Sequence, residues 1–288
     1  MLTVFAPAKI NITLEVLSRR ADGYHTLRSV MLPIALYDRI TLEPSAVQHF
    51  VSSDPGLARD NLVMRAYAAS GATVAHEISL EKHIPVGGGL GGGSSDAAAI
   101  LRAAMTGTLG PIPETDWISV AQSLGSDVPF FLTGTGALVE GYGERVTDIG
   151  SLPPWWVVVA RPHASVATAD AYRLLDESRR RGEPSRARKT SASLAAVDAL
   201  QRRDFAALVP SLQNDFHDII LAAYPAVATC DAALRAAGAD AVLLSGSGSC
   251  VFALFANEEH ARAVAGQIDP AASEALYTVP FHHDDAWR

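Results

Sequence analysis

The stretch IPVGGGLGGGSSDAAAIL, residues 84–101, places six glycines in the seven positions Gly87–Gly93 and runs directly into small and aliphatic residues. A glycine in an ordered element costs about 0.5–1 kcal/mol relative to alanine, so such a run is unfavourable unless the bare backbone has a purpose. A glycine-rich loop that leads into a helix gathers several backbone N–H groups at the positive end of the helix dipole. The stretch therefore predicts a phosphate-binding loop, followed by a helix that Ser94 and Ser95 cap.

Three other interpretations of the loop fit less well. The P-loop pattern needs a lysine after the glycines, and none is present. Residues 87–92 satisfy G-x-G-x-x-G, as any run of glycines would, but Pro85 interrupts the preceding strand pattern and no βαβ unit opens the chain. A flexible linker is disfavoured because Leu90 interrupts the glycines and a helix follows. The string from Pro85 to Ser95 is therefore treated as a motif of its own.

Length and composition bound the class of protein. A chain of 288 residues, 49% of them apolar, predicts about two domains with a sizeable core. The net charge of −8 argues against nucleic acid or an anionic membrane as a partner, since both need a basic face, and favours a small-molecule substrate. Cys230 and Cys250 alone make no disulfide framework. With no signal peptide and no apolar run of membrane-spanning length, we expect a cytoplasmic protein.

The periodicity of the chain predicts mixed α and β structure. We expect strands over residues 3–7, 9–17, 25–32 and 77–86, a hairpin turn at Asp22-Gly23, and helices over 60–72, capped by Asp60 or Asn61, and 112–125, ending at Gly125. A double proline at residues 153–154 then precedes a new strand. We place the domain boundary there, which gives an N-terminal domain of residues 1–150 and a C-terminal domain of residues 151–288.

Three strings resemble the signatures of the GHMP kinases, the family of galactokinase, homoserine kinase and mevalonate kinase. They are APAKINITLEV (6–16), PVGGGLGGGSS (85–95) and LSGSGSCVFAL (244–254). Four more are similar to members that act on a cytidine diphospho sugar alcohol: RADGYHTL (20–27), DNLV (60–63), LGSDVPFF (124–131) and NDF (214–216). The resemblance covers nearly the whole chain. It implies an α+β, two-domain GHMP-kinase-like fold with the active site in the inter-domain cleft, and a kinase that uses ATP and Mg²⁺.

The resemblance assigns the phosphates of ATP to the glycine loop. For Ser94 and Ser95 three roles remain open: capping of the helix, phosphate binding and contact with Mg²⁺. The ligands of the metal stay unknown, because no second acidic ligand can be placed and Asp96 receives no role. A valine at Gly88 or Gly91 is expected to block the phosphates without unfolding the protein. The expected ATP-binding residues are Pro85, Val86, Gly87, Gly88, Gly89, Leu90, Gly91, Gly92, Gly93, Ser94 and Ser95.

Asp127 and Lys9 are the expected catalytic residues. The neighbours of Asp127 alone predict a turn or helix-end aspartate. The resemblance implies instead that Asp127 is the base that takes the proton of the acceptor hydroxyl. Lys9 is one of only three lysines among 23 basic residues and lies in an apolar strand pattern, where a lysine is costly unless it is paired. It resembles the partner of Asp127, which would hold the hydroxyl and stabilise the developing negative charge.

A cytidine acceptor favours aromatic faces and a polar edge that matches the base. Tyr24 and His25, at the mouth of the expected hairpin, would provide one face and one edge. Tyr172 falls where similar family members carry a second aromatic residue, with packing in the core as the alternative. Asn11 is expected to hydrogen-bond the substrate near Lys9.

The remaining polar clusters are given structural interpretations. Asn214 and Asp215 either shape the cleft or cap a helix. Residues 179–190, RRRGEPSRARKT, predict a solvated loop, residues 282–285 a solvated tail, and residues 258–260 the exposed start of a helix. Two competing functions remain open: another small-molecule GHMP kinase, of the homoserine or mevalonate kinase type, and a non-catalytic nucleotide-binding relative.

Overall fold

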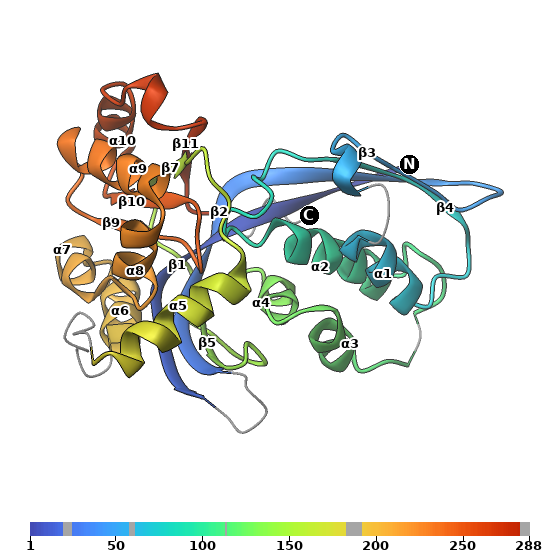
Figure 1. The fold of residues 1–288 in the computed structure, drawn as a ribbon. Coiled ribbons are helices and arrows are strands. Elements are labelled where there is room, and N and C mark those ends of the chain that lie inside the picture. Colours follow the sequence, from blue (N-terminus) through green and yellow to red (C-terminus); the bar gives the residue numbers. More distant parts are fainter. Residues whose placement is uncertain (20–24, 58–60, 113, 183–191, 283–288) are drawn as a thin grey trace.

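Two β-sheets organise the residues that the computed structural model describes, 1–19, 25–57, 61–112, 114–182 and 192–282 (Figure 1). The first has the order β3-β4-β2-β1-β8, with β5 pairing β2 and β6 pairing β5, and the second has the order β11-β7-β10-β9. The first comprises β1 (Leu2–Arg19), β2 (His25–Pro44), β3 (His49–Ser52), β4 (His76–Glu81), β5 (Ala137–Gly141), β6 (Arg145–Asp148) and β8 (Gln213–Asn214). The second comprises β7 (Trp156–Arg161), β9 (Val242–Leu244), β10 (Val251–Phe255) and β11 (Ala275–Pro280).

Helices cover each sheet. Figure 1 shows the first four together against one face of the first sheet: α1 (Leu62–Ala69), α2 (Gly92–Met105), α3 (Trp117–Leu124) and α4 (Val128–Thr133). The others belong to the C-terminal half: α5 (Thr168–Arg180), α6 (Ala192–Gln201), α7 (Phe205–Leu208), α8 (His217–Ala223), α9 (Pro225–Ala236) and α10 (Glu258–Ala265). Short 3-10 turns are η1 (Pro55–Leu57), η2 (Val209–Ser211) and η3 (Pro270–Ala272). The two sheets and their helices are the mixed α and β structure expected from the sequence.

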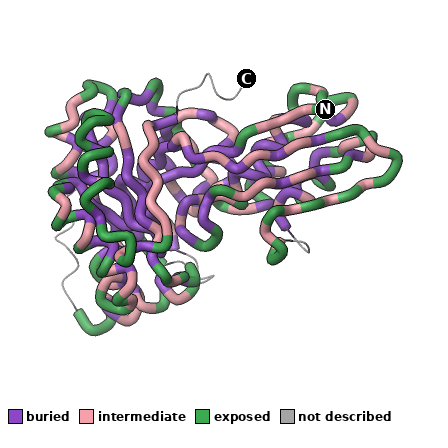
Figure 2. The backbone as a smooth tube through the Cα atoms, turned by 90° about the horizontal axis from the view of Figure 1, so that it is seen from above, coloured by how far each residue is buried: buried purple, intermediate pink, exposed green. Residues whose placement is uncertain are grey.

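Strand β1 passes through the centre of the molecule. Every residue from Ala6 to Val16 is buried, and Figure 2 shows buried residues following the strands. Between Ala6 and Val16 its even positions are apolar, and its odd positions from Lys9 to Glu15 are polar. Successive side chains of a strand point to opposite faces, so this pattern gives β1 one apolar face and one polar face, both inside the protein. A buried polar face must find hydrogen-bond partners within the fold.

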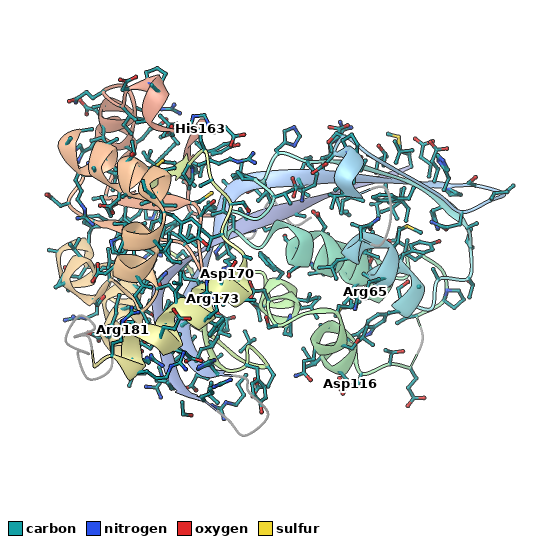
Figure 3. The ribbon with its side chains drawn as sticks, in the orientation of Figure 1. Arg65, Asp116, His163, Asp170, Arg173 and Arg181 are labelled. Atoms are coloured by element: carbon teal, nitrogen blue, oxygen red, sulfur yellow. The ribbon has the colours of Figure 1, made fainter. Side chains whose placement is uncertain are left out.

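Most predicted elements form, with shifted ends. The predicted strands 3–7 and 9–17 are one strand, β1, with a register shift between Pro7 and Ala8. Helix α1 begins after Asn61, whose side chain accepts the Met64 N–H, while Asp60 lies outside the described residues. Helix α3 begins only after Asp116, which caps it (Figure 3), and ends at Gly125 as predicted.

The chain leaves the first sheet between Asp148 and Trp156, where the sequence predicts the domain boundary. It then returns, because β8 pairs in parallel with β1, placing Gln213 beside Thr13 and Asn214 beside Leu14. The boundary itself stays a prediction, since the first sheet contains a strand from the second half of the chain.

The prediction of a solvated tail from residue 282 is wrong for His282. Its side chain is buried, and Nδ1 lies 2.8 Å from the hydroxyl of Tyr37. The backbone N–H of His282 donates to the carbonyl of Pro33, which anchors this end of the chain on β2. Residues 283–285 lie outside the described residues. The exposed helix start at residues 258–260 is confirmed by α10, which Asn257 caps.

Among the described residues, no single helix has the length and apolar character needed to cross a membrane. One pair, α8 with α9, meets these criteria only when the two are taken together, and it is bent by 118°.

Candidate active site

The glycine loop is an irregular turn that ends on α2. Gly87, Gly89 and Gly91 have φ angles of 72°, 74° and 72°, in the left-handed region that favours glycine. Gly91 occupies the N-cap position of α2, and no side chain caps the helix. The prediction that Ser94 and Ser95 cap it is therefore wrong. The N–H groups of the first turn are left for another acceptor, since glycine provides no capping oxygen.

A second glycine turn fixes the loop from behind. The Ser245 hydroxyl donates to the carbonyl of Gly89 at 3.0 Å, and the Cys250 N–H donates to the carbonyl of Gly88 at 3.1 Å. Asn214 in turn holds the second turn, because its Nδ2 donates to the carbonyls of Leu244 and Gly246, both at 2.8 Å. The two glycine motifs, about 150 residues apart in sequence, thus form one backbone platform.

The expected effect of valine at Gly88 or Gly91 needs correction. A Cβ atom on Gly88 would lie 2.6 Å from the Cys250 sulfur, and one on Gly91 would lie 2.9 Å from the Phe131 ring and 3.0 Å from Lys9. Protein atoms therefore fill the space beside both glycines. Side chains at these positions would disturb packing, so loss of ATP binding would not report on phosphate contact.

Gly93 is the better probe, because it is exposed and an added Cβ would meet only Leu62 Cδ1 at an ordinary 3.6 Å. If ATP phosphates bind the start of α2, Gly93→Ala will weaken ATP binding ~10-fold or more, the scale of one lost charge-assisted hydrogen bond. Thermal melting should stay close to that of the parent. Gly266→Ala, at the end of α10 and also in ordinary contact, is the matched control. Unchanged ATP affinity in Gly93→Ala would remove phosphates from this position.

A buried ion cluster ties both ends of the loop to the sheet. Lys82 Nζ donates to Asp96 Oδ2, on α2, at 2.8 Å and also to Asp38 Oδ2 on β2. Asp38 Oδ1 accepts the backbone N–H groups of His83 and Ile84 at 2.6 and 2.9 Å. These bonds end the predicted strand 77–86 at Glu81, because the next N–H groups donate to a side chain instead of to a neighbouring strand.

The charges of this cluster depend on one another. Burial raises the pKa of Asp96 to about 7, Lys82 opposes that shift, and Asp38 adds to it. Burial alone would lower the pKa of Lys82, but the charges of Asp96 and Asp38 outweigh it and raise that pKa. The lysine therefore stays charged between two carboxylates. Sequence analysis left Asp96 without a role, and the structure shows it as a support of the loop.

Lys9 and Asp127 meet beside the loop. Lys9 Nζ lies 3.6 Å from Asp127 Oδ2, and the lysine side chain is only 4% exposed. Asp127 stands at the start of α4, yet its side chain makes no capping hydrogen bond. The backbone N–H of Lys9 donates to the carbonyl of Leu90 at 2.9 Å, which joins β1 to the glycine loop. A simple helix-capping role for Asp127 does not fit this geometry.

Asn11 holds Lys9 in place. Its Oδ1 accepts a hydrogen bond from Lys9 Nζ at 2.6 Å, and its Nδ2 donates to Ser29 Oγ at 2.8 Å. Ser29 donates in turn to the carbonyl of Thr13 at 2.6 Å. Asn11 is 1% exposed, so this chain of bonds orients the lysine from within the protein. Direct contact of Asn11 with a substrate stays a prediction.

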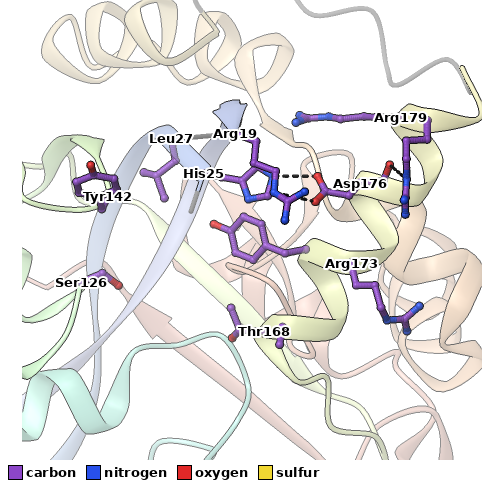
Figure 4. Close-up of a pocket in the computed structure, with 12 residues that line it drawn as sticks. Arg19, His25, Leu27, Ser126, Tyr142, Thr168, Arg173, Asp176 and Arg179 are labelled. Atoms are coloured by element: carbon purple, nitrogen blue, oxygen red, sulfur yellow. Dashed lines mark hydrogen bonds and ion pairs between the residues drawn. The ribbon is translucent and has the colours of Figure 1, made fainter. Parts of the chain in front are cut away.

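A cavity of about 1050 Å³ opens beside α5 (Figure 4). His25 and Tyr172 line it together with Ser126, the neighbour of Asp127. Burial first, and then the charge of Asp127, raise the pKa of the Tyr172 phenol to about 12. Tyr172 therefore keeps its proton at any physiological pH.

The aromatic side chains of the cavity already contact one another. The rings of His25 and Tyr172 are stacked, with centroids 4.9 Å apart and planes 23° apart, and Phe216 meets Tyr172 edge-on at 4.9 Å. A base that stacked on the same face of Tyr172 would compete with His25. Tyr24 lies outside the described residues, so the predicted sandwich of a base between Tyr24 and Tyr172 stays a prediction.

Among the charged residues of the cavity that were not predicted from the sequence are Asp176 and Arg179. Asp176 contacts His25, and Arg179 donates to the carbonyl of Val16 at 2.6 Å and to Asp215 Oδ2 at 3.1 Å. The prediction of a loop from residue 179 is wrong for its first two arginines, because α5 continues to Arg180. Helical spacing from Tyr172 could have revealed both, since residues four and seven positions later lie on the same helix face.

Comparisons with known proteins identify the family of the chain. The GHMP kinases N terminal domain matches residues 61–135, and the GHMP kinases C terminal domain matches residues 196–273. The chain belongs to the GHMP kinase family and is a kinase. It is 39% identical over 277 residues to the 4-diphosphocytidyl-2-C-methyl-D-erythritol kinase of Symbiobacterium thermophilum, covering 93% of this chain and 95% of that protein.

Two solved structures extend the comparison. A crystal structure of 4-(cytidine 5'-diphospho)-2C-methyl-D-erythritol kinase superposes with a TM-score of 0.81 at 36% identity, covering 98% of this chain and 100% of the other. A homoserine kinase from Cytophaga hutchinsonii has a TM-score of 0.71 at 22% identity, covering 98% of this chain and 96% of the other. The second likeness shows a shared fold only.

Proposed function

We propose that the protein transfers the terminal phosphoryl group of ATP to the 2-hydroxyl group of 4-diphosphocytidyl-2-C-methyl-D-erythritol, a step of the non-mevalonate route to isoprenoid precursors. The observation that carries the proposal is the ion pair of buried Lys9 with half-buried Asp127. Lys9 is bonded to the glycine loop through Leu90, and Ser126, the neighbour of Asp127, lines a large cavity with aromatic and charged side chains. Relatives of that name at 38–40% identity over most of the chain support the choice of substrate. A cytoplasmic location stays a prediction.

In this mechanism the two side chains have complementary tasks. The Asp127 carboxylate takes the proton from the acceptor hydroxyl as the oxygen attacks the terminal phosphorus. The ammonium of Lys9 holds that oxygen and stabilises its negative charge, and Asn11 keeps the ammonium in position. The backbone N–H groups at the start of α2 are proposed to bind the ATP phosphates.

ATP chemistry of this kind uses Mg²⁺, which would neutralise charge on the transferred phosphoryl group. Ser95 Oγ and Asp96 Oδ1, at the start of α2, are buried and have no hydrogen-bond partner among the described residues. The residues that the structure describes contain no group of three or more His, Cys, Asp or Glu side chains that could hold a metal ion. One or two protein oxygens suffice for Mg²⁺, which keeps several waters and binds substrate phosphates. Ser95 and Asp96 are therefore the proposed protein donors.

The two alternatives have less support. Solved structures of homoserine and mevalonate kinases share the fold with this chain at 22% and 15% identity, and no feature of the site favours their substrates. A non-catalytic relative would have no use for a buried lysine that faces an aspartate whose side chain makes no capping hydrogen bond. The acceptor, rather than the donor, is therefore the point to test.

The test compares two acceptors in steady-state kinetics: the cytidine diphospho sugar alcohol, and the same sugar alcohol phosphate without its nucleoside. We expect kcat/KM to be at least ~10-fold higher for the first, since base stacking alone contributes about 1–3 kcal/mol. Homoserine and mevalonate serve as further acceptors under the same conditions. Equal efficiency with and without the nucleoside would rule out the cytidine substrate and leave a GHMP kinase with another acceptor.

A further inference from the structure

Asp176 contacts His25, the side chain that is expected to hydrogen-bond the edge of the base. It lies one helical turn after Tyr172 on α5, and its Oδ1 is 2.9 Å from His25 Nε2 (Figure 4). Its other oxygen is 3.7 Å from Arg19 Nε. The His25 side chain is 5% exposed and that of Asp176 is 25% exposed. The carboxylate thus lies at the edge of the cavity, between an imidazole and a guanidinium.

This contact determines where a neutral His25 carries its proton. An ionised carboxylate can only accept hydrogen bonds, so the nitrogen that it contacts must be the protonated one. In the neutral imidazole the other nitrogen, Nδ1, is then an acceptor. The structure records no hydrogen bond from Nδ1 to any described residue, which leaves that acceptor for a ligand.

The orientation of the ring is held as well. The stack on Tyr172 restrains the plane of the imidazole, and the bond to Asp176 restrains its rotation within that plane. A half-turn about the Cβ–Cγ bond would break the bond to Asp176 and leave the carboxylate without its imidazole partner. The site therefore presents one nitrogen in one protonation state.

The consequence concerns the choice between the two common pyrimidines. Cytosine carries an amine at position 4, which is a donor, whereas uracil carries a carbonyl oxygen there, which is an acceptor. We propose that Asp176 is a positioning residue: it holds His25 in the Nε2–H form, so that Nδ1 accepts from the cytosine amine and repels the uracil oxygen. The inference rests on the proposed cytidine acceptor and adds the residue that selects its base.

The experiment measures kcat/KM for the cytidine diphospho acceptor and for its uridine counterpart, at pH 8, where an ordinary imidazole is neutral. The variant is Asp176→Asn, whose amide can accept from Nε2–H or donate to bare Nε2, and so permits both forms of His25. We expect the preference for cytidine to fall ~10–100-fold, the usual range for one base-edge contact. Glu177→Gln removes the same charge one residue later on α5 and should leave the preference unchanged.

A second measurement needs neither substrate nor variant. Nitrogen-15 NMR of the parent enzyme at pH 8 distinguishes a protonated Nε2 from a protonated Nδ1, with the His25 signals assigned by their loss in His25→Gln. We expect Nε2–H in the parent and a mixture in Asp176→Asn. A protonated Nδ1 in the parent would overturn the inference, whether or not the variant folds.

The outcomes separate the two proposals. If the parent enzyme does not phosphorylate the cytidine acceptor, the proposed function fails and the inference fails with it. If the parent prefers cytidine but Asp176→Asn keeps the same preference, the inference alone is overturned. A lower preference in Asp176→Asn together with a mixed His25 signal supports both.

Discussion

Replacing Asp127 with asparagine will lower kcat by ~10²–10⁴-fold, the usual contribution of a general base. Asparagine has nearly the same shape but cannot take a proton from the acceptor hydroxyl. The side chain makes no capping hydrogen bond in α4, and Asn11 Oδ1 still accepts from Lys9 Nζ in the variant, so the start of α4 and the position of Lys9 should be kept. Dissociation constants for ATP and for the acceptor, measured without turnover, should therefore stay near the parent values.

The matched control is Asp198→Asn on α6, where an exposed aspartate pairs with the exposed Arg202 in an i,i+4 contact. Its kcat should equal that of the parent. Near-normal turnover in Asp127→Asn would remove this residue from the proton transfer and leave Lys9 without a catalytic partner. Loss of ATP affinity equal to the loss of kcat would instead indicate a damaged site.

Replacing Lys82 with methionine will lower the free energy of unfolding by about 3–5 kcal/mol, the usual cost of removing one partner from a buried ion pair. Methionine has a similar length, but it leaves Asp38 and Asp96 buried together without a cation. Urea unfolding at constant pH measures the change. Asp96→Asn in the same chain removes one of the two carboxylates and should recover part of the loss, as coupled neighbours do.

The loss should also depend on pH. Burial raises the pKa of Asp96 to about 7 even with Lys82 present, and without Lys82 the opposing shift is gone. In the unfolded chain the carboxyl ionises near its ordinary value of 3.8, so stability falls as pH rises from about 4 through 7. The Lys82→Met defect should therefore be larger at pH 8 than at pH 5.

A neighbouring residue provides the control for this variant. Arg39 pairs with Glu81 on the surface, where the two side chains are 43% and 47% exposed. Arg39→Met should cost less than about 1 kcal/mol, because water already screens that pair. A Lys82→Met effect no larger than the Arg39→Met effect would show that the buried cluster does not stabilise the loop.

Local sequence patterns predicted the glycine loop and the helix ends, whereas the buried ion cluster depends on tertiary contacts. The glycine run, the cap at Asn61 and the end of α3 at Gly125 each depend on a few adjacent residues, which a single sequence displays. The cluster around Lys82 joins residues 38, 82 and 96, and neither its burial nor its partners has a local signature. The scarcity of lysine in this chain was a usable signal for such buried ion pairs, because two of the three lysines are buried in one.

The errors have the same physical origin. The sequence predicts Ser94 and Ser95 as helix caps because serine is a good capping residue. The Leu90 carbonyl instead accepts the Lys9 N–H, Gly91 takes the left-handed N-cap position, and α2 starts earlier, at Gly92. The sequence predicts that Arg179 and Arg180 lie in a solvated loop, but Arg179 lies on α5 and donates to the Asp215 carboxylate and the Val16 carbonyl. In each case a partner distant in sequence outweighed the local preference.

The return of the chain to its first sheet matters during synthesis on the ribosome. When the first 150 residues have emerged, Lys9, the glycine loop and Asp127 have all been made, but β8 beside β1 and the turn at Ser245 that holds Gly89 have not. Contacts between residues 13 and 213, or 89 and 245, close very long loops, and such contacts form late and slowly. The nascent chain therefore carries the side chains proposed for catalysis well before it has the support that arranges them, and we expect kinase activity only after the turn at Ser245 has been made.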